Sequence, residues 1–119
     1  MTLEKLDISY NRITKLDTSA FGPLEKLQML KLQHNTIQQI RPGAFNSLKE
    51  VQILDLSHNH LQALPHMCFS DMVFLRKVDF SHNHLRALPP SVFTGTEVET
   101  INFAYNEFVS MPTDALSVI

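Results

Sequence analysis

Cysteine and glycine are scarce in this sequence of 119 residues, and each shortage narrows the possible classes of protein. Cys68 is the only cysteine, so no disulfide can form within the chain. Only three glycines occur, and neither a phosphate-binding loop nor a G-x-S-x-G nucleophile motif is present. Ten Lys and Arg residues against 12 Asp and Glu give a formal net charge of −2, which does not favour binding to nucleic acid or to an anionic membrane.

Long apolar runs are also missing. No stretch approaches the roughly 20 apolar residues that a membrane-spanning helix needs. The start, MTLEKLDISYNR, carries charges at Glu4, Lys5 and Asp7 where a signal peptide would be continuously apolar. There is no N-glycosylation sequon. Taken alone, these absences are typical of a reduced, soluble protein or of a piece of a larger one, and they keep a cytoplasmic location open.

A period of 24 residues runs through the chain. The stretch DLSHNHLQAL at 55–64 returns as DFSHNHLRAL at 79–88, with two changes in ten positions. When the sequence is written in lines of 24 residues, all residues after residue 2 fall into aligned repeats. We therefore predict a single domain of five repeats, at residues 3–26, 27–50, 51–74, 75–97 and 98–119, of which the fourth is one residue short.

Positions that align across the repeats, called columns below, indicate how each repeat folds. Seven columns are apolar in all five repeats. The segment L-x-x-L-x-L predicts a short strand whose inner face cannot be buried alone, so stacked repeats should pair their strands into a parallel sheet. Pro65, Pro89 and Pro112 follow an apolar column and predict an extended or turn-like return path.

An asparagine column follows each predicted strand. An inward-pointing amide is costly unless it is hydrogen-bonded, and a ladder of amides can bond the exposed backbone of the bends. This predicted structural ladder comprises Asn11, Asn35, Asn59, Asn83 and Asn106.

The pattern L-x-x-L-x-L-x-x-N-x-L-x-x-L-x-x-x-x-A-F-x-x-L resembles the 24-residue typical leucine-rich repeat over essentially the whole chain. The resemblance implies an α/β-type solenoid, curved, with a parallel β-sheet on its concave face and irregular or short helical convex segments. Typical repeats of this kind belong to extracellular receptors and matrix proteins, for example Toll-like receptors, which signal in innate immunity. An extracellular or cell-surface location follows from the resemblance.

The resemblance fails at the ends of the array. Family members outside the cell usually carry cysteine-rich caps, and neither cap is present here. Cys68 lies in a column of small apolar residues, so we predict that its side chain is buried and fills space in the core. Uncapped repeats leave apolar columns open, here at Leu3 and at Val98, which suggests a fragment of a longer array and possible self-association. Because the segment FTGTE leaves the fourth repeat one residue short, we predict that the fifth repeat stacks slightly out of register on the fourth, a mis-step between the two.

Two chemical interpretations of the histidine-rich decapeptide are weak. Asp55, Ser57 and His58 lie along one strand edge, where we expect neighbours to splay apart and not to converge on a nucleophile, so an enzyme is not predicted. Stacked repeats bring histidines within about 5 Å of one another, but those columns hold no carboxylate or thiol besides Glu107. We therefore predict no metal site and no cofactor.

Exposed columns that vary between repeats are where binding should occur. They surround an apolar centre at Met29 and Ile53 with charged side chains and rings, which is the usual composition of a protein-contact patch, although isolated surface apolar residues are also common. The predicted partner-binding residues are Tyr10, Met29, Lys31, His34, Ile53, Asp55, His58, Lys77, Asp79, His82 and Tyr105.

Three functions fit these observations. The first is a non-enzymatic binding module of a cell-surface or secreted receptor, which grips a protein or another macromolecular ligand. The second is a structural spacer within a longer solenoid, and the third is an intracellular scaffold. No membrane contact is predicted within this segment, although a longer parent chain could be anchored.

Overall fold

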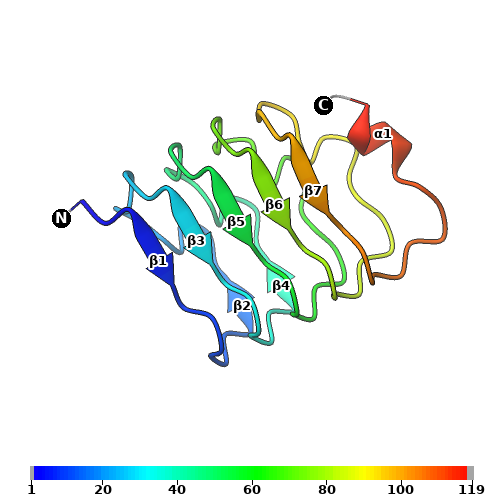
Figure 1. The fold of residues 1–119 in the computed structure, drawn as a ribbon, viewed down its shortest axis with the longest axis horizontal. Helices are drawn as coiled ribbons and strands as arrows, with labels where there is room; N and C mark the ends of the chain where they lie inside the picture. Colours follow the sequence, from blue (N-terminus) through cyan, green and yellow to red (C-terminus); the bar gives the residue numbers. More distant parts are fainter. Residues whose placement is uncertain (1, 118–119) are drawn as a thin grey trace.

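Five short strands, one from each predicted repeat, form a single parallel sheet in the computed structural model, which describes residues 2–117 (Figure 1). The sheet order is β1-β3-β5-β6-β7, so consecutive repeats lie side by side. The strands are β1 (Lys5–Asp7), β3 (Met29–Lys31), β5 (Ile53–Asp55), β6 (Lys77–Asp79) and β7 (Thr100–Asn102). The predicted solenoid with a parallel sheet is confirmed.

The pairing register follows the apolar columns. Leu30 pairs with Leu54 and Leu54 with Val78, and all three are fully buried. The residues on either side of each central residue point outward, because side chains alternate along a strand. The same register continues from Val78 to Ile101, so the predicted mis-step after FTGTE is wrong within the sheet.

The shorter fourth repeat is accommodated outside the sheet. Gly95 lies at φ +83°, where an added Cβ would be 3.3 Å from the carbonyl oxygen of Ser70 in the previous repeat. The tight turn that absorbs the missing residue therefore needs a glycine, since other residues rarely adopt this conformation.

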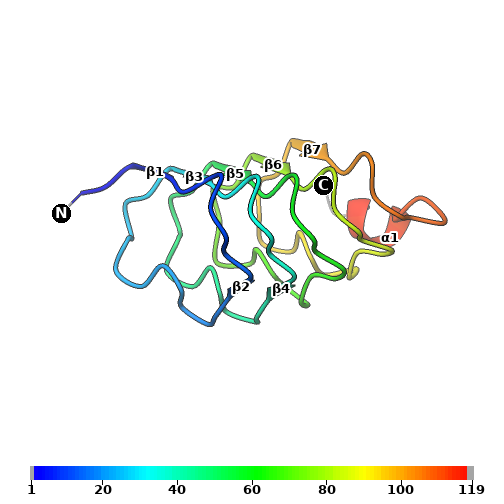
Figure 2. The same ribbon diagram turned by 90° about the horizontal axis from the view of Figure 1, so that it is seen from below.

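Turns make up most of the outer segments. A second, two-stranded parallel sheet of β2 (Lys15–Leu16) and β4 (Gln39–Ile40) lies opposite the main sheet, a feature that the sequence did not predict (Figure 2). The only helix among residues 2–117 is α1 (Thr113–Leu116), at the C-terminal end of the stack (Figure 1). Pro112 directly precedes it.

The core lies between these two sides and is continuous from repeat to repeat. Phe21, Phe45, Phe69 and Phe93 are buried, with centroids of neighbouring rings 5.9–6.2 Å apart. Cys68 is buried beside them, and its burial raises the pKa of the thiol. The cysteine is therefore a small core residue.

Burial differs between the middle and the ends of the stack. Leu3 and Ile101 are only partly buried, whereas Leu54 is fully buried. Two expectations are corrected here. Val98 is buried and not open, and Met111, which falls in an apolar column, has 63% of its surface exposed. Position 111 lies in the last repeat, where no following repeat covers it among the described residues. Residues 118 and 119 of the fifth predicted repeat lie outside the described residues.

Candidate functional site

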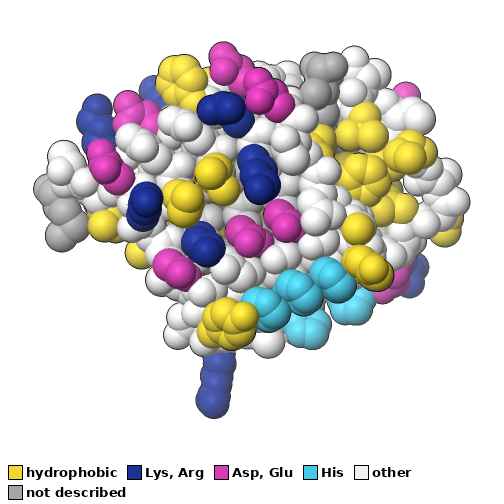
Figure 3. Space-filling model, in the orientation of Figure 1, with side chains coloured by type: hydrophobic (Ala, Val, Ile, Leu, Met, Phe, Trp, Pro, Cys, Tyr) yellow, Lys and Arg dark blue, Asp and Glu magenta, His cyan; other side chains and the backbone are white. Residues whose placement is uncertain are grey.

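The outward surface of the main sheet, called the sheet face below, corresponds to the concave face expected from the sequence. Ile53 is 36% exposed and Met29 is half-buried, and they are register partners on adjacent strands. Figure 3 shows apolar side chains at the centre of this face with Lys, Arg, Asp and Glu around them. A hollow in the face is lined by Gln52, Ile53, Arg76, Lys77, Glu99 and Thr100.

Aspartates of the sheet face are held by local hydrogen bonds. The Ser57 hydroxyl donates to Asp55 Oδ1 at 2.6 Å, and the Ser57 backbone N–H donates to the same oxygen at 2.9 Å. Asp79 and Ser81 repeat this arrangement. The expectation that aspartate and serine splay apart is therefore wrong, because the chain turns directly after the strand and brings them together.

Ser57 and Ser81 are also buried, although their column was expected to be exposed. Each serine hydroxyl donates a hydrogen bond to the aspartate of its own repeat and is not turned toward a histidine. In the first repeat the same bonds from the hydroxyl and backbone N–H of Ser9 lower the pKa of Asp7. The Asp-x-Ser pairs thus fix the bend after three of the five strands, β1, β5 and β6.

Five aromatic rings form a stack along one edge of the sheet face. We call this stack the ring ladder; its members are Tyr10, His34, His58, His82 and Tyr105. Centroids of neighbouring rings are 4.1–4.4 Å apart, and their planes differ by 8–12°. Figure 3 shows the histidines as a row below the charged residues of the face. The ladder joins five of the predicted binding residues into one continuous strip.

An unusual backbone conformation presents these rings. Every ladder residue has φ between +54° and +58°, in the left-handed region that non-glycine residues seldom adopt. The backbone N–H of His58 donates to the Ser81 carbonyl of the next repeat at 3.0 Å, and that of His34 donates to the Ser57 carbonyl. These bonds tie the ladder residues of neighbouring repeats together at the spacing of the strands.

The central ring of the ladder has a perturbed acidity. Partial removal from water lowers the pKa of His58, and the neighbouring His82 and His34 lower it further. Asp79 and Asp55 act in the opposite direction. The net effect favours the neutral imidazole at this position.

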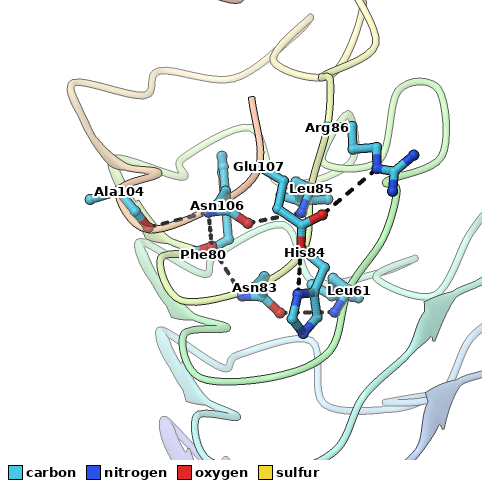
Figure 4. Close-up of polar contacts among 9 residues, drawn as sticks. All are labelled: Leu61, Phe80, Asn83, His84, Leu85, Arg86, Ala104, Asn106 and Glu107. Carbon is cyan, nitrogen blue, oxygen red and sulfur yellow. Dashed lines mark hydrogen bonds and ion pairs between the residues drawn. The ribbon is translucent and has the colours of Figure 1, made fainter. Parts of the chain in front are cut away.

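A second histidine column lies beside the ladder. His60 and His84 stack with centroids 5.8 Å apart, and His84 Nδ1 contacts Glu107 Oε2 at 2.6 Å (Figure 4). Arg86 Nε lies 3.7 Å from the other oxygen of Glu107. Among residues 2–117, no group of three or more His, Cys, Asp or Glu side chains is arranged to hold a metal ion.

The asparagine column ties each repeat to the one before it. Asn59 Oδ1 accepts a hydrogen bond from the Ile37 backbone N–H at 3.0 Å, and Asn59 Nδ2 donates to the Leu32 carbonyl at 3.1 Å. Asn83 and Asn106 form the same bonds one and two repeats later (Figure 4). Asn11, in the first repeat, is exposed and bonds only within its own bend.

Three further predicted binding residues are charged side chains of the sheet face, and one of them, Lys77, is the register partner of Ile53. Lys31 and Asp79 are half-buried, and Lys77 is exposed. The sequence predicted that histidines of neighbouring repeats lie close together, but it did not predict that the rings stack face to face or that His84 pairs with Glu107. The available signal was that Tyr and His fill one column in all five repeats, directly before the asparagine.

The fold and the asparagine ladder define a repeat solenoid. A leucine-rich repeat profile matches residues 1–61, about half of the chain, and a second profile of the same kind matches residues 74–95. The chain belongs to the leucine-rich repeat family. A search of curated proteins finds no match.

Solved structures share the fold. A crystal structure of a TLR13–ssRNA13 complex superposes with a TM-score of 0.88 at 26% identity, covering 93% of this chain and 16% of that one. The leucine-rich repeat domain of APL1B superposes with a TM-score of 0.87 at 24% identity, covering 92% of this chain and 34% of that one. This chain thus spans only 16% and 34% of the lengths of the two structures. Within residues 2–117, no helix is long and apolar enough to cross a membrane.

Proposed function

We propose that this chain is a non-enzymatic binding module that holds a protein partner on its sheet face, as part of a cell-surface or secreted receptor. The observation that carries the proposal is the adjacent apolar pair of exposed Ile53 and half-buried Met29, surrounded by charged side chains and bordered by the ring ladder. Apolar surface rimmed by polar groups is typical of protein contact sites. The similarity to the TLR13 structure, together with the resemblance to the typical repeats of extracellular receptors, supports the receptor setting.

The sheet is well suited to this role because its backbone is fixed by pairing on both sides of each inner strand. A rigid surface loses little conformational entropy on binding, so contacts at Ile53 are not offset by the ordering of loops. The aspartates next to it are fixed by their serines, so their charges have defined positions.

The test is a selection of displayed secreted-protein domains against the chain at pH 7.5, followed by affinity measurements with two variants. Ile53→Lys places a charge at the apolar centre, and we expect affinity to fall about tenfold or more. Val73→Lys is the matched control, since Val73 is 40% exposed against 36% for Ile53 but lies outside the sheet. Partners that tolerate Ile53→Lys and are lost with Val73→Lys would contradict binding through the sheet face.

A further inference from the structure

We propose that the ring ladder makes partner binding pH-dependent: it recruits an acidic segment of a partner protein when its histidines are protonated. This rests on the proposed function and names a class of partner and a mode of regulation for the same face. The carrying observation is the continuous stack of three imidazoles between two tyrosines, at ring spacings of 4.1–4.4 Å.

The strip is accessible from solvent. His58 and His82 are exposed, and the two terminal rings, Tyr10 and Tyr105, are 73% and 76% exposed. The ring faces cover one another, so the ring edges, which carry the imidazole nitrogens, are what a partner can contact. Those nitrogens accept or donate hydrogen bonds when neutral, and both donate when the ring is protonated.

The charged side chains beside the ladder determine how protonation of its histidines changes the net charge of this surface. The flanking columns hold the following titratable or charged groups: Asp7, Lys31, Asp55 and Asp79 on the strand side, and Arg12, His60, His84 and Glu107 on the other side. At neutral pH the carboxylates outnumber the Lys and Arg in this set. Each proton that a ladder histidine or the His60–His84 pair takes up adds positive charge beside these carboxylates.

Stacking makes this charging interdependent. Two protonated rings at 4.1 Å repel each other, so successive protons bind less readily along the ladder. A carboxylate placed across two ring edges offsets the repulsion. Binding of an acidic segment and proton uptake by the ladder should therefore strengthen each other, as thermodynamic linkage requires.

The structure favours an acidic peptide over a nucleic acid. Single-stranded nucleic acid is bound by stacking of its bases on free aromatic faces along a cationic groove. Here each imidazole face is covered by a neighbouring ring and is closed to a base. The apolar pair Met29 and Ile53 on the same face suits aliphatic side chains next to the acidic residues of a peptide.

The experiment measures binding of a fluorescein-labelled glutamate decamer by anisotropy at pH 7.5 and 5.5. Glutamate remains largely ionised at both values. Each new ion pair at an exposed site strengthens binding roughly threefold, so two pairs should tighten it about tenfold at the lower pH. A variant with His58→Asn and His82→Asn should lose most of this gain, and asparagine is the replacement that best tolerates a positive φ.

Two controls test whether the pH response comes from the ladder histidines. His66→Asn removes the one histidine that lies in neither column, and it should keep the full gain. Calorimetry of the unmodified chain in two buffers of different ionisation enthalpy should show net proton uptake on binding at pH 5.5, which does not depend on the folding of any variant.

Several outcomes would overturn the proposal. They are equal tightening in the double variant, no proton uptake, no binding of the glutamate decamer at pH 5.5, or a uridylate decamer that binds as tightly with the same histidine dependence. The Ile53→Lys assay at pH 7.5 tests the sheet face separately. If Ile53→Lys weakens partner binding but binding does not respond to pH, the proposal for the ladder is wrong and the proposed function stands. If Ile53→Lys does not weaken partner binding, the proposed function itself is wrong.

Discussion

At the scale of single residues, the asparagine column shows most clearly how one side chain supplies hydrogen bonds to backbone groups of the neighbouring repeat. Asn59→Ala would leave the buried Ile37 backbone N–H without its partner, and the Leu32 carbonyl would keep only the hydrogen bond from Asn35. We expect the free energy of unfolding to fall by about 1–3 kcal/mol. Urea denaturation measures this change.

Asn11→Ala is the matched control for that variant. The Asn11 side chain is exposed and bonds only to carbonyls of its own bend, so its loss leaves no buried group unpaired. We expect the unfolding midpoint to stay close to that of the unmodified chain. Equal losses for the two asparagines would show that bonding between repeats is not what Asn59 contributes.

The lowered pKa of His58 predicts a pH dependence of stability. The unfolded chain binds this proton near the ordinary value of 6.5, whereas the folded chain binds it only at lower pH. The contribution of His58 to stability is therefore complete above pH 6.5 and is lost as the pH falls through the folded pKa. Urea midpoints between pH 7.5 and 5 should decline less steeply in His58→Asn than in the unmodified chain or in His66→Asn.

At the scale of elements, each strand depends on its neighbours. The inner strand β5 pairs with β3 and β6, and its central Leu54 is fully buried, whereas β7 pairs only with β6 and Ile101 is partly exposed. We expect amide hydrogen exchange to be faster in β7 than in β5, because the last repeat lacks half of its interface.

Exchange measured by mass spectrometry on a monomeric sample checks this expectation. The first strand, β1, serves as the internal comparison, since it also has a neighbour on one side only. Protection of β7 equal to that of β5 would mean that α1 and the segment before it close the end of the core.

At the scale of the whole molecule, the C-terminal end carries exposed apolar side chains. Val109 and Met111 are 94% and 63% exposed, and Phe103 and Phe108 are only partly buried. Strand β7 also presents an unpaired edge. We expect these 119 residues to self-associate in a concentration-dependent way.

Sedimentation velocity over a range of concentrations tests that expectation. A variant with Val109→Asp and Met111→Asp should shift the chain toward the monomer without a lower unfolding midpoint, because both side chains are already in solvent. An unmodified chain that remains monomeric at the highest concentrations would contradict association through this end.

Much of this architecture was decided by the sequence itself. The 24-residue period predicts the strand register, the buried columns and the asparagine ladder, because stacked copies of one pattern can bury their apolar faces only by aligning them. The sequence also predicts that Tyr10, His34 and His58 share a column, since residues at equal positions in successive repeats become neighbours.

Only the tertiary structure decided what that column does. The pattern does not determine φ, and only the folded chain shows the left-handed conformation that brings the rings into parallel contact, with hydrogen bonds between repeats such as that from His58 to Ser81. The same holds for exposure. Met111 and Leu64 occupy equivalent positions, and one is exposed while the other is buried, because burial depends on whether another repeat packs against it and not on the residue alone.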